Sequence, residues 1–156
     1  MIVLTRIDHR LLHGQVSFLW VRNVGADCIL IANDSLAKDN LRMSALRLAR
    51  PAGVKLVMKS VEDSIKSINE GETDKYNLLI IVENVDDAHR LALGCPAIKS
   101  INVGGMKNAE DRKQISKAVF VSENDIEKFK EMHEKGIELE IRMVPNDQKI
   151  DVMTLI

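Results

Sequence analysis

Two histidines, two arginines and one aspartate occur together in the stretch RIDHRLLHGQV, which runs from Arg6 to Val16. An imidazole in such a setting can act as a base, as a metal ligand, or as a nucleophile that accepts a phosphoryl group. Arginine presents a planar fork of donors that matches phosphate oxygens and stays charged at neutral pH. The question is therefore which of His9 and His13 does chemistry, and of what kind.

A metal site is the first alternative, because His9 and His13 are four residues apart and would share one face of a helix. Arg6 and Arg10 argue against it, since fixed cations repel a dication and no cysteine or further histidine lies nearby. We expect no metal ion and no cofactor here. The same cations favour phosphate. Arg10 shares the loop with His13, whereas Arg6 can equally pair with Asp8 and hold the loop.

A helix is expected to begin at or just after His13, because Val16, Leu19 and Trp20 follow at helical spacing. The N-terminus of a helix carries partial positive charge and stabilises an anion by about 0.3–1 kcal/mol in exposed geometry. His13 would then stand where an anion is favoured, which suits a phosphoryl group.

The elements that must position this loop are those of an α/β fold, because β-rich runs alternate with helix-period segments along the chain. We predict a single domain over residues 1–156, with a mainly parallel central sheet of about seven strands flanked by helices on both faces. The expected strands span residues 2–7, 28–33, 54–58, 77–82, 98–103, 118–121 and 137–144. The last run alternates apolar and charged residues, as an edge strand with one wet face would.

Helix ends are also visible in the sequence. Ser60 and Ser122 each stand three residues before an aspartate, the spacing of a capping box, and a glycine lies where each of these helices should stop. Another helix is expected over about residues 35–50. Its residues at core spacing are Leu41, Ala45, Leu48 and Ala49.

The carboxyl ends of parallel strands are where ligands bind in open α/β sheets. Three stretches therefore lie at the expected site, namely residues 8–16, 33–40 and 102–108. Gly104 and Gly105 in the third stretch either turn backbone N–H groups toward an anion or form a tight turn.

Composition sets limits on the function. The chain is 46% apolar and 29% charged with a formal net charge of −1, as in a soluble globular protein without the surplus positive charge that binds nucleic acid. No apolar run is long enough for a membrane span, and no signal peptide is evident, so we expect a cytoplasmic protein. Cys28 and Cys95 are expected to be reduced packing residues.

RIDHRLLHGQV resembles the active-site loop of the mannose/fructose/sorbose family of sugar phosphotransferase (PTS) IIB components, whose usual wording is RIDDRLIHGQV. INVGGM, residues 101–106, resembles a second segment of that family. The resemblance implies a domain of this length with a mainly parallel seven-stranded sheet. It also implies that His13, the histidine directly before Gly-Gln-Val, is phosphorylated, at Nδ1. His9 stands where aspartate is usual, and its role stays open.

The implied activity is that of a phosphohistidine:sugar phosphotransferase without a cofactor. A IIA phosphocarrier passes its phosphoryl group to His13, which hands it to the sugar during uptake through the membrane IIC and IID subunits. The protein would then be cytoplasmic and associated peripherally with the transporter complex. The sequence leaves a homo-oligomer possible and does not determine the oligomeric state. The predicted phosphate-binding residues are Arg10, Gly14 and Gln15, and the predicted loop-organising residues are Arg6 and Asp8. The sugar itself is not predicted by any residue of the chain.

A histidine phosphatase is a second hypothesis, because Leu12-His13-Gly14 is superficially similar to the Arg-His-Gly loop of that superfamily. It fits poorly, since leucine stands where arginine is needed. A second catalytic histidine would also be required, and His89 and His133 lie in charged, helix-like surroundings typical of a solvated surface.

A non-catalytic module that binds an anion or a partner is a third hypothesis. Its best feature is a set of basic residues that would present a cationic face to an acidic protein, although such faces are usually just solvated. These residues are Lys38, Arg42, Arg47 and Arg50. If they lie beside the His13 loop, they would suit docking of a IIA domain.

Overall fold

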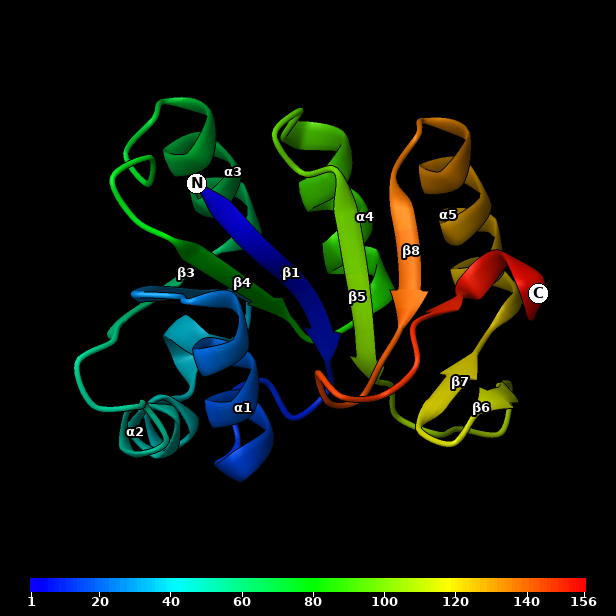
Figure 1. Ribbon diagram of the computed structural model, residues 1–156, viewed down its shortest axis with the longest axis horizontal. Helices are drawn as coiled ribbons and strands as arrows, with labels where there is room; N and C mark the ends of the chain where they lie inside the picture. Colours follow the sequence, from blue (N-terminus) through cyan, green and yellow to red (C-terminus); the bar gives the residue numbers. More distant parts are fainter.

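The computed structural model describes residues 1–156 as one α/β domain, shown in Figure 1. The strands are β1 (Ile2–Asp8), β2 (Cys28–Ala32), β3 (Lys55–Lys59), β4 (Leu78–Val82), β5 (Ser100–Gly105), β6 (Lys113–Ser116), β7 (Val119–Val121), β8 (Glu138–Ile141) and β9 (Ile150–Asp151). The helices are α1 (Gly14–Val24), α2 (Asn40–Leu48), α3 (Val61–Asn69), α4 (Val85–Gly94) and α5 (Glu123–Glu134), with short 3-10 helices η1 (Leu36–Lys38) and η2 (Val152–Thr154).

The main sheet has seven strands in the order β3-β2-β4-β1-β5-β8-β9. All neighbouring pairs are parallel except β8 and β9, which are antiparallel. The carboxyl ends of the parallel strands therefore meet at one edge, the lower edge in Figure 1, where the loop after β1 lies. The predicted fold class is confirmed.

The membership of the sheet differs from the prediction in two places. Residues 118–121 do form a strand, β7, but it pairs with β6 in a separate two-stranded hairpin. The seventh strand of the main sheet is instead β9, which has only two residues and no apolar pattern to reveal it. Because β9 pairs with β8, the prediction that 137–144 is an edge strand is wrong, and Glu140 is buried.

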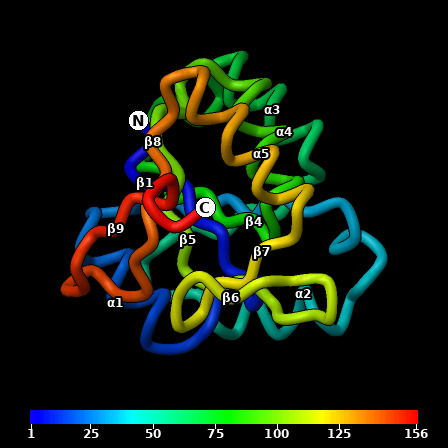
Figure 2. Tube along the Cα trace, turned by 90° about the vertical axis from the view of Figure 1, so that its right-hand side faces the viewer, coloured from blue at the N-terminus to red at the C-terminus, as the bar shows by residue number.

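The sheet separates two apolar cores. Along β2, Ile29 and Ile31 face one core with α1, while Cys28 and Leu30 face the other with α3, α4 and α5. Figure 2 shows these helices on opposite sides of the sheet. Since both faces of the strand are buried, its sequence is continuously apolar, as the covered sheet requires. The prediction of helices on both faces is therefore confirmed.

The capped helices begin and end where the sequence predicts. The Ser60 hydroxyl accepts the Asp63 N–H at the start of α3, and Ser122 forms a complete capping box with Asp125 at the start of α5. Gly71 follows α3 with a φ of +79°, a left-handed conformation that glycine adopts without strain.

The helix expected over 35–50 is divided into η1 and α2, with Asp39 capping α2 through the Arg42 N–H. The assignment of Leu41, Ala45 and Leu48 to the core is wrong, because Leu41 and Leu48 are 84% and 88% exposed and Ala45 is exposed as well. Leu46 is the buried residue of α2, and Leu36 from η1 joins it in the core on the α1 side.

Both cysteines are free and buried, as the sequence predicts. Burial raises the pKa of the Cys95 thiol to about 11, which fits a packing residue rather than a reactive one. None of the helices has the length and apolar character needed to cross a membrane.

Candidate active site

The loop after β1 is fixed by its backbone and by two buried leucines. The N–H of His9 donates to the carbonyl of Gly105, and the N–H of Leu11 donates to that of Asp8. Leu11 has a φ of +59°, which is unfavourable for a residue with a side chain, and Leu11 and Leu12 are both buried in the core on the α1 side. Their apolar contacts hold the turn that brings His13 back over Asp8.

Asp8 is the centre of the loop, and its side chain is 1% exposed. Its Oδ2 lies 2.9 Å from Nε2 of His13 and 3.3 Å from Nη2 of Arg6. Its Oδ1 accepts the backbone N–H of Arg10 at 3.0 Å and lies 3.5 Å from Nε of the same residue. One carboxylate thus orients the histidine and both arginines of the motif.

The charge state of Asp8 follows from these contacts. Burial alone would raise the pKa of Asp8, but hydrogen bonds from His13 and the Arg10 N–H, together with the charge of Arg6, outweigh it and hold the pKa below its ordinary value. At neutral pH the group is therefore a carboxylate, which can only accept hydrogen bonds.

His13 stands at the N-cap of α1, and its backbone N–H donates to the Ser17 hydroxyl at 2.8 Å. Because Asp8 accepts, Nε2 of His13 carries the proton and Nδ1 carries the lone pair. The side chain is 22% exposed, so the ring reaches the surface while one edge is held from below. Such a ring can act as a nucleophile through Nδ1.

Arg6 is fully enclosed beneath the loop and cannot reach a ligand. Its Nη1 donates to the side chain of Asn102 and to the carbonyl of Arg142, and its Nη2 donates to the carbonyl of Met143. Its guanidinium also lies 5.2 Å from the centre of the Trp20 ring. Burial lowers the pKa of Arg6, and the charge of Asp8 opposes this effect.

Gly104 is explained by Arg6. Both glycines of INVGGM lie in β5, so neither forms the tight turn that the sequence allowed. A Cβ added at Gly104 would lie 2.0 Å from Cζ of Arg6, so only glycine leaves room for the guanidinium. At Gly105 the nearest atom, Nδ1 of His9, would be 3.4 Å away. Of the two glycines, it is therefore Gly104 that makes room for the buried side chain of Arg6.

The predicted phosphate-binding residues lie on the open side of the loop. The side chain of Arg10 is 48% exposed, and only its Nε approaches Asp8. Gly14 and Gln15 are exposed in the first turn of α1, and Gly14 has a φ of +45°. Together with His13 they form a surface with free N–H groups and one guanidinium, which are groups that could hold an anion.

The other histidines do not contribute to this site. His89 on α4 contacts Glu131 of α5 at 2.8 Å, and its side chain is only 15% exposed, so the expectation of a solvated surface residue is wrong for it. His133 is exposed on α5, as expected. Both helices pack on the face of the sheet away from α1, so neither His89 nor His133 supplies the second histidine that a phosphatase would require.

Of the basic residues considered for a cationic face, Arg42 reaches the edge of the sheet that carries the loop. It pairs with Glu83 at 2.7 Å and lines a cavity together with His9. Lys38, Arg47 and Arg50 are exposed, and Arg50 donates to the carbonyl of Val54. A larger cavity of about 460 Å³ lies away from the loop, along β3 from Lys55 to Lys59 and beside the amino ends of β2 and β4.

A family model for the PTS system sorbose subfamily IIB component matches residues 2–156. The chain belongs to this family. IIB components are phosphotransferases of sugar transport, and the resemblance seen in RIDHRLLHGQV is thereby confirmed over the whole chain.

Curated relatives and solved structures agree with this membership. This IIB component is 34% identical to the PTS system fructose-specific EIIB component of Bacillus subtilis (strain 168), over 99% of the chain and 95% of the relative. It is 37% identical to the PTS system mannose-specific EIIAB component of Escherichia coli (strain K12), over 98% of the chain and 47% of the relative. The crystal structure of the IIBSor domain of the sorbose permease from Klebsiella pneumoniae superposes with a TM-score of 0.94 at 31% identity, covering 99% and 94% of the two chains.

Proposed function

We propose that this IIB component relays a phosphoryl group through His13, from a phosphohistidine of a IIA component to a sugar hydroxyl, during uptake through the membrane IIC and IID subunits. The observation that carries the proposal is the 2.9 Å contact between Nε2 of His13 and the buried carboxylate of Asp8. A IIA partner is supported by the name EIIAB of the E. coli relative. On this proposal the protein works in the cytoplasm, at the membrane transporter complex.

In the first step, the lone pair on Nδ1 of His13 attacks the phosphorus of the donor phosphohistidine. A new N–P bond forms while the N–P bond of the donor breaks, and that electron pair returns to the donor imidazole. The ring of His13 gains positive charge in this step. Asp8 compensates this charge with its carboxylate, which accepts a hydrogen bond from Nε2–H and stays ionised.

In the second step, a sugar hydroxyl oxygen attacks the phosphorus and loses its proton to solvent. The electron pair of the N–P bond returns to Nδ1 of His13, so the ring regains its starting state. Both steps balance in atoms and electrons without a metal ion, because the phosphoryl group only passes from one nucleophile to another.

The remaining residues stabilise charge on the phosphoryl group. Arg10 supplies guanidinium donors, and the first turn of α1 at Gly14 and Gln15 supplies backbone N–H groups. A relay must bind the phosphoryl group without making its onward transfer unfavourable. Each ~1.4 kcal/mol of extra stabilisation of the phosphorylated form shifts the transfer equilibrium tenfold. One half-exposed arginine and a helix N-terminus form a clamp of suitable, modest strength.

The test is incubation with a IIA component that carries a radioactive phosphohistidine. We expect the wild type to take up an acid-labile label and His13→Ala to take up none, with an unchanged circular dichroism spectrum. His133→Ala removes an exposed histidine far from the loop and should accept label normally. Labelling of His13→Ala at the wild-type stoichiometry would contradict the proposal.

A further inference from the structure

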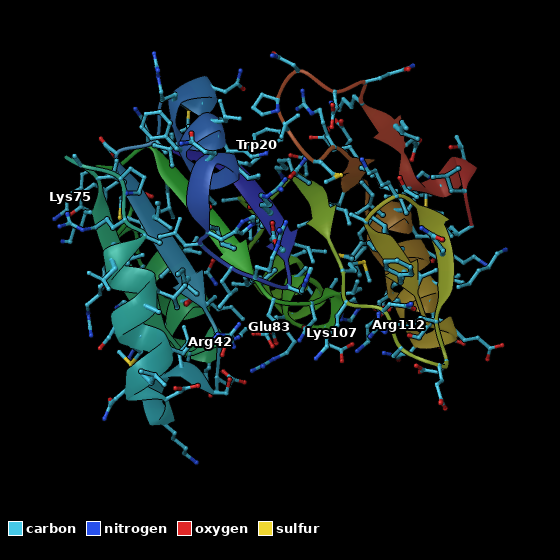
Figure 3. The ribbon with its side chains drawn as sticks, turned by 90° about the horizontal axis from the view of Figure 1, so that it is seen from below. Trp20, Arg42, Lys75, Glu83, Lys107 and Arg112 are labelled. Atoms are coloured by element: carbon cyan, nitrogen blue, oxygen red, sulfur yellow. The ribbon has the colours of Figure 1, made fainter.

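A cavity of about 400 Å³ opens at the carboxyl edge of the sheet, beside the loop but outside the His13 surface. Its polar lining consists of His9 after β1, Arg42 of α2, Glu83 and Asn84 before α4, and Lys107 and Arg112 after β5. Four of these residues follow one another along the edge in Figure 3, on the side of the sheet away from Trp20. The volume suits a ligand of the size of a monosaccharide.

Two guanidinium groups in this cavity are held in place by the protein. Arg42 pairs through Nη1 with Glu83 at 2.7 Å. Arg112 uses Nη1 for Asp125 at 2.7 Å and for the carbonyl of Phe120 at 3.0 Å. Since a guanidinium has five N–H donors, each of these contacts leaves donors free while it fixes the plane of the group.

Two further groups have no acidic partner. Lys107 is exposed and forms no ion pair, so its charge is not balanced within the protein. His9 packs over Gly105, and its Nδ1 is buried without a hydrogen-bond partner. Because Nδ1 is enclosed, Nε2 is the ring nitrogen left to meet a ligand in the cavity.

Glu83 is the carboxylate that would oppose an anion in this cavity. Its Oε2 is bound by Arg42 at 2.7 Å and approached by the side-chain amide of Asn33 at 3.4 Å, so its charge is largely compensated. Its other oxygen can pair with hydroxyl groups, and so can the side-chain N–H groups of Asn84, whose Oδ1 already accepts the Asp87 N–H at 2.9 Å. The cavity thus combines an end that attracts a phosphate with an end that suits hydroxyls.

We propose that this cavity is a second, noncovalent site that binds a phosphorylated sugar. Lys107, Arg112 and His9 contact the phosphate, while Glu83 and Asn84 contact hydroxyl groups. Binding itself involves no transfer step and does not require His13. Resting on the proposed relay, a phosphate dianion held here would also repel the incoming phosphohistidine, and so let accumulated product slow the relay.

The test is isothermal titration of the full chain with fructose 6-phosphate as the probe, and with fructose and inorganic phosphate as matched probes. We expect fructose 6-phosphate to bind with a Kd of about 1 mM, inorganic phosphate more weakly, and fructose undetectably. Lys107→Glu and His9→Asp should each weaken binding by about tenfold or more, because each places a carboxylate in the cavity. Lys66→Glu makes the same charge change on an exposed position of α3 and should leave the Kd unchanged.

His13→Ala separates this site from the relay, since it should abolish phosphoryl acceptance and keep the wild-type Kd for fructose 6-phosphate. The proposal is overturned if the wild type does not bind the probe, or if Lys66→Glu weakens binding as much as Lys107→Glu. It is also overturned if binding is lost in His13→Ala but kept in Lys107→Glu, because the probe would then occupy the phosphoryl surface. Histidine NMR gives a second measurement: the resonances of His9 should shift on titration and those of His133 should not.

Discussion

The two sides of the loop after β1 are held in opposite ways. On the closed side, Arg6 is 4% exposed and bonded to Asp8, Asn102 and two backbone carbonyls beneath Trp20. On the open side, Arg10 and His13 reach the surface, and each touches the protein through one edge of its side chain. The two arginines of the motif therefore have different roles. Arg6 is a buried structural residue that fixes Asp8, and Arg10 is an exposed hydrogen-bond donor.

The difference shows how a buried charge can serve an exposed reaction. A buried arginine is tolerated only when its donors are satisfied, and the contacts that satisfy Arg6 also fix the carboxylate of Asp8. Asp8 belongs to both sides, because the same oxygen that meets Arg6 also holds His13. On the proposed relay, the ring of His13 is thus positioned by groups that do not touch the phosphoryl group, while Arg10 is left exposed to bind and release it.

Substitution of Gly104 should disrupt the contacts of Arg6 on the closed side and cause the largest loss of stability. In Gly104→Ala the new methyl group would lie 2.0 Å from Cζ of Arg6, so the guanidinium must leave its site and lose its contacts together. This would leave Asp8 without its buried partner, and we expect the free energy of unfolding to fall by about 4 kcal/mol. Urea denaturation measures the loss.

Gly105→Ala is the matched control, because the nearest side-chain atoms would lie 3.4 and 3.5 Å from the new Cβ. We expect this variant to lose about 1 kcal/mol or less. Equal losses in the two variants would mean that the close approach of Arg6 to the backbone does not explain the first glycine.

Asp8→Asn tests the residue that joins the two sides. The amide keeps the shape but not the charge that balances Arg6, so we expect a loss of about 2 kcal/mol at neutral pH and a slower uptake of label. Because the pKa of Asp8 is lower in the folded protein than in the unfolded chain, ionisation of the carboxylate stabilises the fold above the unfolded pKa of about 3.9.

This stabilisation is lost as the pH falls through the lowered pKa of the folded state. The difference between wild type and Asp8→Asn should therefore be full near pH 7 and should narrow as the pH drops below about 4. Denaturation curves at a series of pH values measure it. A difference that does not depend on pH would show that shape, and not charge, is what Asp8 supplies.

Most of the fold follows from local signals in the sequence. Continuous apolar runs such as residues 78–82 mark buried strands, and Ser60 and Ser122 mark helix starts, because capping is decided within a few residues. β9 could not be predicted, since a two-residue strand is defined by its partner β8 and not by its own composition. Leu41 and Leu48 have core spacing, yet α2 turns Leu46 to the core instead, which depends on how the helix docks.

The candidate site divides in the same way. His13, Asp8 and Arg10 fall in one motif, so their relationship is visible in the sequence. The closed side is not, because Arg6 contacts Asn102 and the carbonyls of residues 142 and 143, which are more than 90 residues away along the chain. The sequence placed Gly104 after the expected strand 98–103 and Trp20 on a helix face, and neither pattern pointed to the buried arginine.

Arg10→Ala should have the smallest effect on stability and so sharpens the contrast with Arg6. Its side chain is half exposed and its ion pair with Asp8 is long, so we expect the free energy of unfolding to change by about 0.5 kcal/mol or less. The rate of label uptake should nevertheless fall by about tenfold, because the transferring phosphoryl group loses a guanidinium. Arg10→Lys keeps the positive charge but lacks the planar guanidinium. Its rate of label uptake should therefore lie between those of the wild type and Arg10→Ala. If Arg10→Ala instead lowers the free energy of unfolding as much as Gly104→Ala, Arg10 is a structural residue like Arg6. The phosphate would then have to be held by the N-terminus of α1 alone.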